Sequence, residues 1–368
     1  LEVSRKLCHF FKDHHGYFRP DGSFVGDEKF FGEEKGKYGG HFHAHTNCLL
    51  AFVECGTAAK DQELLDFAKM SYEYARGPRA YASTLTGFFP EFLGPEYPNS
   101  EGCPVADMVA LAVMLSRDGV GDYWDDADRW LRNYFSEIQL SPEQGVCLDQ
   151  LSRKQPQLDE IPYHASSDRT TERNIGAFAG WPAPNDWIHH IGIQHCCTGN
   201  GARAIYYAWE SILKFNEGNL KINLLLNRAS PWADIYSSIP YEGKVEVKIK
   251  QDCKSVAVRM PEWIKPGDEA VKCEVGGKSI PFKWDGRYIN LGSADAGKKI
   301  VVTFPIEEKT VKEKIAGTEY TLVLRGNAVV QMDPKGPNCP LYQREHMRTS
   351  QTPWHKTNRF VSHELIAW

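Results

Sequence analysis

The sequence lacks long apolar runs and has no concentration of positive charge. No stretch of about 18 apolar residues occurs, so no membrane-spanning helix is predicted, and the first residues show no signal peptide. The 43 Lys and Arg side chains are scattered and are outnumbered by 48 Asp and Glu. Because nucleic-acid binding needs a basic patch or stripe, we expect neither nucleic acid nor membrane as a partner.

Cysteine is also too sparse for a disulfide scaffold. The chain has 10 cysteines in 368 residues, without a repeating framework, so we expect most to be reduced. Reduced thiols are typical of the cytoplasm, and we expect a cytoplasmic location. The sequence begins at Leu1 without a Met and resembles the middle of a helix, so we expect the native N-terminus to lie upstream. A periplasmic or secreted location therefore stays open.

Apolar residues recur at helical spacing in the first part of the chain and alternate with polar ones in the second. Helices are predicted over residues 47–58, 62–76, 105–116, 122–138 and 202–213. Long loops rich in Gly, Pro and aromatic residues separate them. Strands are predicted over residues 244–250, 255–260, 271–275, 287–291, 299–304 and 320–324.

This change of period predicts an α+β chain of two tightly packed domains, a helical catalytic domain at 1–225 and an antiparallel β-sandwich at 226–368. Helices joined pairwise by elaborate loops favour a toroid of the (α/α)6 type with its loops around one mouth. A complete toroid needs more helices than the pattern shows, so we expect it to be incomplete at the N-terminus. A sandwich edge or a truncated toroid can pair with a second copy, which leaves a homodimer open.

Two cysteine-containing segments each lie just before a predicted helix. Cys196 and Cys197 are adjacent, and Cys103 follows Glu101 by two residues. A helix N-terminus favours thiolate over thiol, and alternate residues of an extended segment point to the same side. Zinc takes four ligands and accepts both sulfur and carboxylate oxygen. The four residues therefore predict a Zn²⁺ site assembled from two helix-capping loops.

A family resemblance supports this interpretation. The motifs that carry it run in one order through most of the chain: Ser100-Glu101-Gly102-Cys103, Cys196-Cys197-Thr198-Gly199-Asn200-Gly201-Ala202-Arg203, Val258-Arg259-Met260-Pro261-Glu262-Trp263, Leu324-Arg325-Gly326 and Asn358-Arg359-Phe360-Val361. Together they resemble the β-L-arabinofuranosidase group of glycoside hydrolases, family 127 and its relatives. The resemblance implies a barrel of paired helices before β-sandwich domains, and zinc held by a Glu, a Cys and two adjacent Cys.

The resemblance also assigns catalytic roles. It implies that Cys196 is the nucleophile of a retaining mechanism, in the place of one of the two carboxyl groups that such enzymes normally use. The acid/base in the family is a Glu shortly upstream of the Glu-x-Cys pair. Glu91 is the nearest match and Glu96 the alternative; Pro90 replaces the Gly that precedes the family's Glu, and the spacing to Glu101 is shorter.

Histidine and tryptophan residues near these motifs are candidates for substrate binding. Because relatives use histidines at the barrel mouth, we expect His43 and His45 to contact sugar hydroxyls, with a purely structural role as the alternative. A loop that leads into the cysteine pair contains Trp187 and His189. We expect these to supply a stacking platform and a hydroxyl partner.

The sequence thus favours a zinc-dependent retaining glycoside hydrolase that releases terminal β-L-arabinofuranose or a similar sugar from plant-type oligosaccharides or glycoconjugates. Less specific interpretations stay open. The adjacent cysteines can be buried apolar residues, or the zinc can be purely structural, since four protein ligands close a site. The alternative functions are a non-catalytic carbohydrate-binding or scaffold protein, and a hydrolase or lyase acting on uronic acids.

Overall fold

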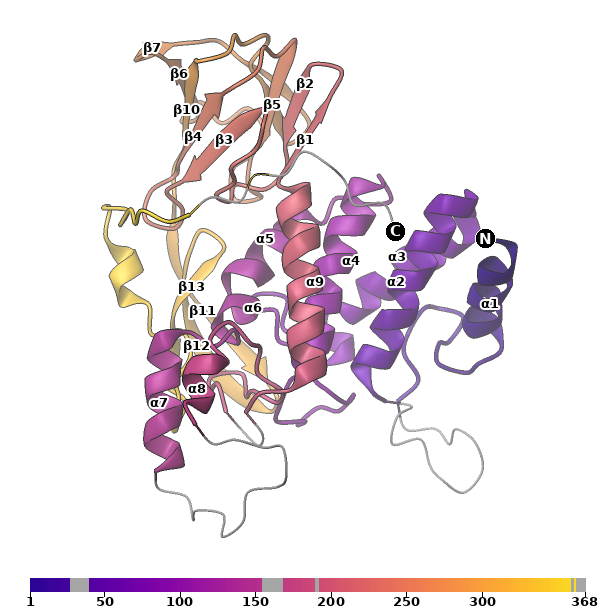
Figure 1. The fold of residues 1–368 in the computed structure, drawn as a ribbon. Helices are drawn as coiled ribbons and strands as arrows, with labels where there is room; N and C mark the ends of the chain where they lie inside the picture. The colour runs from indigo at the N-terminus through magenta and orange to yellow at the C-terminus, as the bar shows by residue number, and fades with distance from the viewer. Residues whose placement is uncertain (27–39, 154–167, 189–191, 359–360, 362–368) are drawn as a thin grey trace, which may run out of the picture. The chain divides into compact units, whose positions relative to one another are not determined.

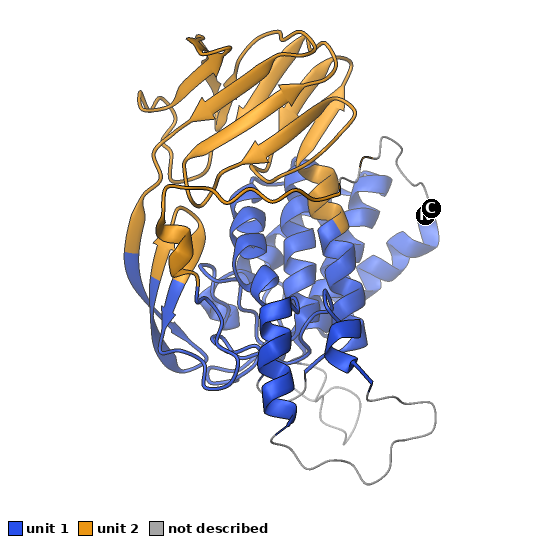
Figure 2. Ribbon diagram, turned by 60° about the vertical axis from the view of Figure 1, so that its left-hand side comes forward, with its two compact units in different colours: residues 1–205, 310–322, 331–343 blue, residues 206–309, 323–330, 344–368 orange. Residues whose placement is uncertain are grey.

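The computed structural model describes residues 1–26, 40–153, 168–188, 192–358 and 361. The contacts divide the chain into two compact units, which Figure 2 colours separately. Unit 1 comprises residues 1–205, 310–322 and 331–343, and unit 2 comprises residues 206–309, 323–330 and 344–368. The first segment of the helical unit thus ends before residue 225, and the unit also includes the later segments 310–322 and 331–343. A single domain boundary near residue 225 stays a prediction.

Unit 1 is mainly helical (Figure 1). Its helices are α1 (Glu2–Asp13), α2 (Phe42–Ala59), α3 (Gln62–Ala75), η1 (Pro78–Ala80), α4 (Gly102–Arg117), α5 (Trp124–Arg132), α6 (Tyr134–Glu137), α7 (Pro142–Ser152), α8 (Thr170–Arg173) and the start of α9 (His195–Ser211). Every residue of α4 from Gly102 to Leu115 is buried. Since a helix that is apolar on all sides must be covered on all sides, α4 is the central helix of this unit.

The expected helices at 62–76 and 105–116 are confirmed within three residues, whereas α2 and α9 begin five and seven residues before the expected starts at 47 and 202. The cysteine pair therefore lies inside α9 and not ahead of it. The helix expected over 122–138 is interrupted. Asn133 leaves the helical region, with φ −106° and ψ −114°, and its side-chain amide donates a hydrogen bond to the carbonyl of Leu85 at 3.0 Å. A neighbouring loop therefore fixes a break that the apolar pattern does not reveal.

Helix α7 was not predicted from the sequence. It begins with a capping box in which Ser141 and Gln144 bond each other's backbone N–H groups, with Pro142 in the first turn. These are strong start signals. The apolar spacing after them is weak, which explains why periodicity alone missed the helix.

Unit 2 contains two five-stranded sheets. One has the order β1 (Leu213–Asn216), β2 (Asn219–Ile222), β5 (Ser255–Arg259), β9 (Tyr288–Asn290), β8 (Lys283–Asp285); the other has β3 (Ala233–Ser237), β4 (Lys244–Ile249), β10 (Lys299–Thr303), β6 (Lys272–Val275), β7 (Lys278–Ser279). Burial alternates along β4 and β5, so each sheet has one buried face, as in a sandwich. The expectation of a purely antiparallel arrangement is wrong at one place, because β2 pairs with β5 in parallel.

A third sheet consists of β11 (Glu308–Ile315), β12 (Thr318–Arg325) and β13 (Ala328–Asp333). The turn between β11 and β12 has Ala316 and Gly317 at positive φ, 49° and 82°, as a two-residue hairpin requires. This hairpin end belongs to unit 1, where the Ser83 hydroxyl donates a 2.9 Å hydrogen bond to the Glu313 carboxylate. The third sheet therefore contributes residues to the helical unit.

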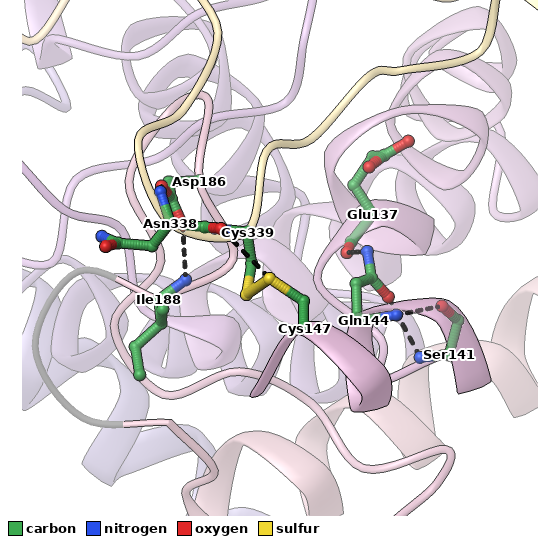
Figure 3. Close-up of a disulfide and its surroundings, with 8 residues drawn as sticks. All are labelled: Glu137, Ser141, Gln144, Cys147, Asp186, Ile188, Asn338 and Cys339. Atoms are coloured by element: carbon green, nitrogen blue, oxygen red, sulfur yellow. Dashed lines mark hydrogen bonds between the residues drawn. A yellow bond between two sulfur atoms is a disulfide. The ribbon is translucent and has the colours of Figure 1, made fainter. Parts of the chain in front are cut away.

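A disulfide joins Cys147 of α7 to Cys339, 192 residues later, within unit 1 (Figure 3). Asp186 anchors the same segment, because its carboxylate accepts hydrogen bonds from the backbone N–H groups of Asn338 at 2.6 Å and Cys339 at 2.9 Å. The other eight cysteines are free, in keeping with the expectation that most are reduced. No described helix meets the length and hydropathy that a membrane crossing requires.

The disulfide closes a long loop, so its removal should destabilise the protein. We expect the double variant Cys147→Ala/Cys339→Ala to lose about 2–5 kcal/mol of unfolding free energy, measured by urea denaturation followed by circular dichroism. A phosphine reductant should lower the wild-type protein to the same midpoint and leave the double variant unchanged. Equal midpoints of the oxidised wild type and the double variant would contradict a structural role for this bond.

Candidate metal centre

The structure brings together the four residues that the sequence proposed as metal ligands. The ligand atoms of Glu101, Cys103, Cys196 and Cys197 all lie within 4.8 Å of one another. The Sγ atom of Cys197 lies 3.6 Å from that of Cys103 and 4.0 Å from that of Cys196. The Glu101 Oε1 atom lies 3.8 Å from the Cys197 sulfur and 3.9 Å from the Cys196 sulfur.

These distances match the edges of a tetrahedron around a zinc ion. Zinc–ligand bonds of about 2.3 Å to sulfur and 2.1 Å to oxygen give sulfur–sulfur edges of about 3.8 Å and sulfur–oxygen edges of about 3.6 Å. Each of the four measured edges lies within a few tenths of an ångström of these values. The donor set of three thiols and one carboxylate therefore fits a zinc ion in both chemistry and size.

Two helix starts supply the ligands. Glu101 is the N-cap of α4, with extended φ −127° and ψ 141°, and Cys103 lies in the first turn; Cys196 and Cys197 lie in the first turn of α9. Gly102 permits the close approach, because a Cβ atom there would lie 2.7 Å from the Ala179 carbonyl oxygen and 2.8 Å from the Cys197 Cβ. A larger residue would push the two helix starts apart.

The burial of the four groups differs. Cys103 and Cys197 are fully buried and Glu101 is nearly so, whereas Cys196 is half-buried. Burial and the neighbouring Cys103 raise the pKa of the Cys196 thiol to about 11, and the hydrogen bond with Cys197 together with burial raises the pKa of Cys103. A bound cation would supply the opposite charge that holds the thiols ionised. Cys196 is the ligand with surface left for a substrate.

A histidine orients the carboxylate ligand. His41, the N-cap residue of α2, places Nε2 2.9 Å from Glu101 Oε2, so the imidazole N–H donates to the oxygen that faces away from the sulfurs. Burial raises the pKa of Glu101, but the bond from His41 and the proximity of His43 outweigh it and hold this pKa below its usual value. A hydrogen-bond partner of this kind fixes a metal ligand in position.

Glu91 lies next to this centre and Glu96 does not. A carboxylate oxygen of Glu91 lies within 4.8 Å of the ligand atoms of both His41 and Glu101. The Tyr97 hydroxyl donates to Glu91 Oε2 at 2.7 Å and fixes its orientation. Glu96 is exposed, against the β11–β12 turn, where a Cβ at Gly317 would lie 3.1 Å from its Cγ. The structure therefore brings Glu91 to the cluster of predicted residues and leaves Glu96 outside it.

The predicted substrate-binding residues have different environments. His43 is half-buried, and its Nδ1 lies 2.6 Å from the Asp107 carboxylate. His45 has no exposed surface, and its ring stacks on Phe24 at 4.4 Å. Trp187 is also fully buried, which leaves no face for a sugar to stack on. His189 lies outside the described residues. Sugar contact by these residues stays a prediction, which the placement favours only for His43.

The burial of His45 predicts acid sensitivity. Burial lowers its pKa to about 4, from 6.5. As the pH is lowered from 6.5 to 4, the His45 side chain takes up a proton in the unfolded chain but not in the folded protein. The free energy of unfolding should therefore decrease by about 3 kcal/mol over this pH window. The difference in urea-unfolding free energy between wild type and His45→Gln should therefore shrink as pH falls from 6.5 to 4.

The exposed His14 provides the matched control. His14→Gln should leave the unfolding free energy nearly unchanged, as substitutions of exposed residues usually do. A constant difference between wild type and His45→Gln across the window would show that His45 does not titrate with a depressed pKa.

Similarity to known proteins is found in the fold and not in the sequence. No protein-family model and no curated protein matches the sequence. Three solved structures are similar, each at 14% sequence identity. A GH127 β-L-arabinofuranosidase from Geobacillus stearothermophilus T6 matches 78% of this chain and 46% of its own with a TM-score of 0.49, and a further GH127 β-arabinofuranosidase matches 89% of this chain and 59% of its own with a TM-score of 0.48. A protein described as a glycoside hydrolase matches 79% of this chain and 51% of its own with a TM-score of 0.50.

The third of these shows that the chain shares its fold with a solved glycoside hydrolase. The chain spans about half the length of these proteins, 46–59%. At 14% identity the likeness concerns the fold alone, so activity has to be argued from the site.

Proposed function

We propose that this protein is a zinc-dependent retaining glycoside hydrolase with a cysteine nucleophile, on a helical domain of the (α/α)6 type. The observation that carries the proposal is the convergence of Glu101, Cys103, Cys196 and Cys197 at tetrahedral spacing, with Glu91 beside them. A closed structural zinc site has no need of an oriented carboxylate next to it. A glycosidase does, because its leaving group requires a proton.

The metal would be held by these four ligands, and when bound it supplies the positive charge that keeps their sulfurs ionised. The reaction then uses two residues. The Cys196 sulfur attacks the anomeric carbon while the glycosidic C–O bond breaks and the Glu91 carboxyl gives its proton to the leaving oxygen. Glu91, now a carboxylate, takes a proton from water, whose oxygen attacks the same carbon and displaces the Cys196 sulfur. Two inversions give net retention.

The substrate class is proposed from the motifs that resemble family 127, and two of the similar solved structures are described as β-arabinofuranosidases. We therefore propose terminal β-L-arabinofuranose, or a sugar of similar shape, in plant-type glycans. His43 is half-buried, with its ring 5.9 Å from the ring of His41, and we assign it to a sugar hydroxyl. The Cys147–Cys339 disulfide favours an oxidising compartment, periplasmic or extracellular, over the cytoplasm for this chain.

The test is hydrolysis of a panel of nitrophenyl glycosides by the purified protein, with zinc counted per chain. We expect one zinc per chain, release of nitrophenol from the β-L-arabinofuranoside, and a first-formed sugar of β configuration by NMR. Matched α-L-arabinofuranosides should react far more slowly. Inverted product would exclude the cysteine mechanism. Sugar binding by calorimetry without product would favour the non-catalytic alternative, and an unsaturated product absorbing in the ultraviolet would indicate a lyase.

A further inference from the structure

A buried carboxylate lies one to two helical turns from the metal ligands and contacts two neighbouring helices. Asp107 of α4 has no exposed surface. Its Oδ2 lies 2.6 Å from His43 Nδ1 and accepts a 2.7 Å hydrogen bond from the Thr46 hydroxyl, both on α2. Its Oδ1 accepts a 2.6 Å hydrogen bond from Arg203 Nη2 on α9. One side chain thus joins three helices.

The same helices carry the ligand set. Asp107 follows Cys103 by four residues on α4, and Arg203 follows Cys196 by seven on α9, so each pair lies on one helix face, one and two turns apart. Helix α2 begins at His41, which bonds Glu101. The separation of α2, α4 and α9, and with it the spacing of the ligands, therefore depends in part on contacts that meet at Asp107.

We propose that Asp107 is a positioning residue for the metal centre, which holds α2, α4 and α9 at the separation that the four ligands need. The inference deepens the proposed function and rests on it. The partners of Asp107 support this role. A carboxylate in the core is stable only when it is paired and hydrogen-bonded. The partners of Asp107 come from α2 and α9, the two helices that must be placed correctly for the site to form. An ordinary core ion pair would stabilise the fold without affecting the affinity for metal.

A second buried carboxylate provides the matched control. Asp126 of α5 accepts hydrogen bonds from Tyr72 at 2.9 Å, from Arg76 at 2.7 Å and from Arg129 at 3.3 Å. It is 2% exposed and thus nearly as buried as Asp107. Tyr72 lies on α3, Arg76 directly after α3 and Arg129 on α5, and neither of these helices carries a predicted metal ligand. Asp107→Asn and Asp126→Asn therefore remove the same charge from similar surroundings, with only one of them next to the centre.

The measurement is zinc affinity by chelator competition, together with the visible spectrum of the Co²⁺-substituted protein, which reports the geometry of thiolate ligation. We expect Asp107→Asn to raise the zinc Kd about 10- to 100-fold, the range typical for partners that orient metal ligands, and to alter the cobalt bands. Asp126→Asn should lower the unfolding free energy but leave the Kd within about twofold. The milder Thr46→Val, which removes one donor and keeps the ion pairs, should raise the Kd less than Asp107→Asn.

A Kd for Asp107→Asn within twofold of wild type, or an equal rise for Asp126→Asn, overturns the positioning role. If Asp107→Asn does not fold, Thr46→Val decides, since an unchanged Kd and cobalt spectrum overturn the inference. A wild-type protein that takes up no zinc overturns both this inference and the proposed function. Normal zinc binding by wild type with a normal Kd in Asp107→Asn overturns the positioning role alone.

Discussion

Replacement of Cys196 by Ser is expected to abolish turnover while the metal is retained. The half-buried Cys196 is the ligand with surface available to a substrate, and a serine hydroxyl is a far weaker nucleophile than a thiolate. Loss of a covalent nucleophile leaves only the contribution of binding and of the remaining groups, so kcat should fall about 10⁴-fold or more. Glu101, Cys103 and Cys197 remain as three ligands, a number that suffices to hold zinc in many catalytic sites.

The matched control is the same substitution at a ligand that has no assigned role in the reaction. Cys103 is fully buried and has no assigned role in the reaction, so Cys103→Ser should keep its activity per bound zinc, and any fall in its activity should follow a fall in zinc content. A cysteine in unit 2, Cys273, is buried in β6, and Cys273→Ser should retain both. Metal analysis and initial rates on the nitrophenyl substrate separate the three cases. Turnover by Cys196→Ser above a tenth of the wild-type value would contradict a cysteine nucleophile.

The parts of the fold that the sequence predicts are those that depend on local pattern. Apolar periodicity locates α2, α3 and α4, and alternation locates β4 and β5, because each of these elements buries one face or the whole of its surface. The break at Asn133 and the parallel pairing of β2 with β5 depend on partners far along the chain. No local pattern contains that information.

The same distinction holds for the site. The adjacent cysteines and the Glu-x-Cys pair, together with the resemblance to family 127, indicated Glu101, Cys103, Cys196 and Cys197 without coordinates. The disulfide partner of Cys147 lies 192 residues away, and connectivity of this kind is not deducible from sequence.

A sequence signal for Asp107 exists, but apolar periodicity does not reveal it. It is a charged residue inside the otherwise apolar run of α4, where burial without a partner would be costly. For the histidines the sequence pattern predicted too much. Alternate His residues suggested the same role for His43 and His45, although His45 is buried and His43 is half-exposed.

The second large effect is expected for Glu91→Gln, which removes the group proposed to donate and accept the proton. General acid–base assistance contributes about 10²–10⁴-fold, and the loss should depend on the leaving group. Alkyl β-L-arabinofuranosides, whose oxygen needs protonation, should lose the full factor in kcat/KM. With nitrophenyl glycosides the leaving group is nitrophenolate, which departs without a proton, so glycosylation of Cys196 should stay fast. The second step, in which water is activated to hydrolyse the glycosyl-enzyme, should become rate-limiting. We expect a burst of one nitrophenol per chain and a glycosylated Cys196 by mass spectrometry.

Glu96→Gln is the matched control, because Glu96 is exposed against the β11–β12 turn whereas Glu91 lies beside His41 and Glu101. It should retain kcat/KM within about twofold on both kinds of substrate, as surface substitutions away from a site usually do. Added azide should restore turnover of nitrophenyl glycosides by Glu91→Gln, since an anionic nucleophile needs no base, and should give the β-glycosyl azide. If the loss, the burst and the rescue appear in Glu96→Gln, the acid/base is Glu96, and the Tyr97 hydrogen bond to Glu91 serves only to order the loop.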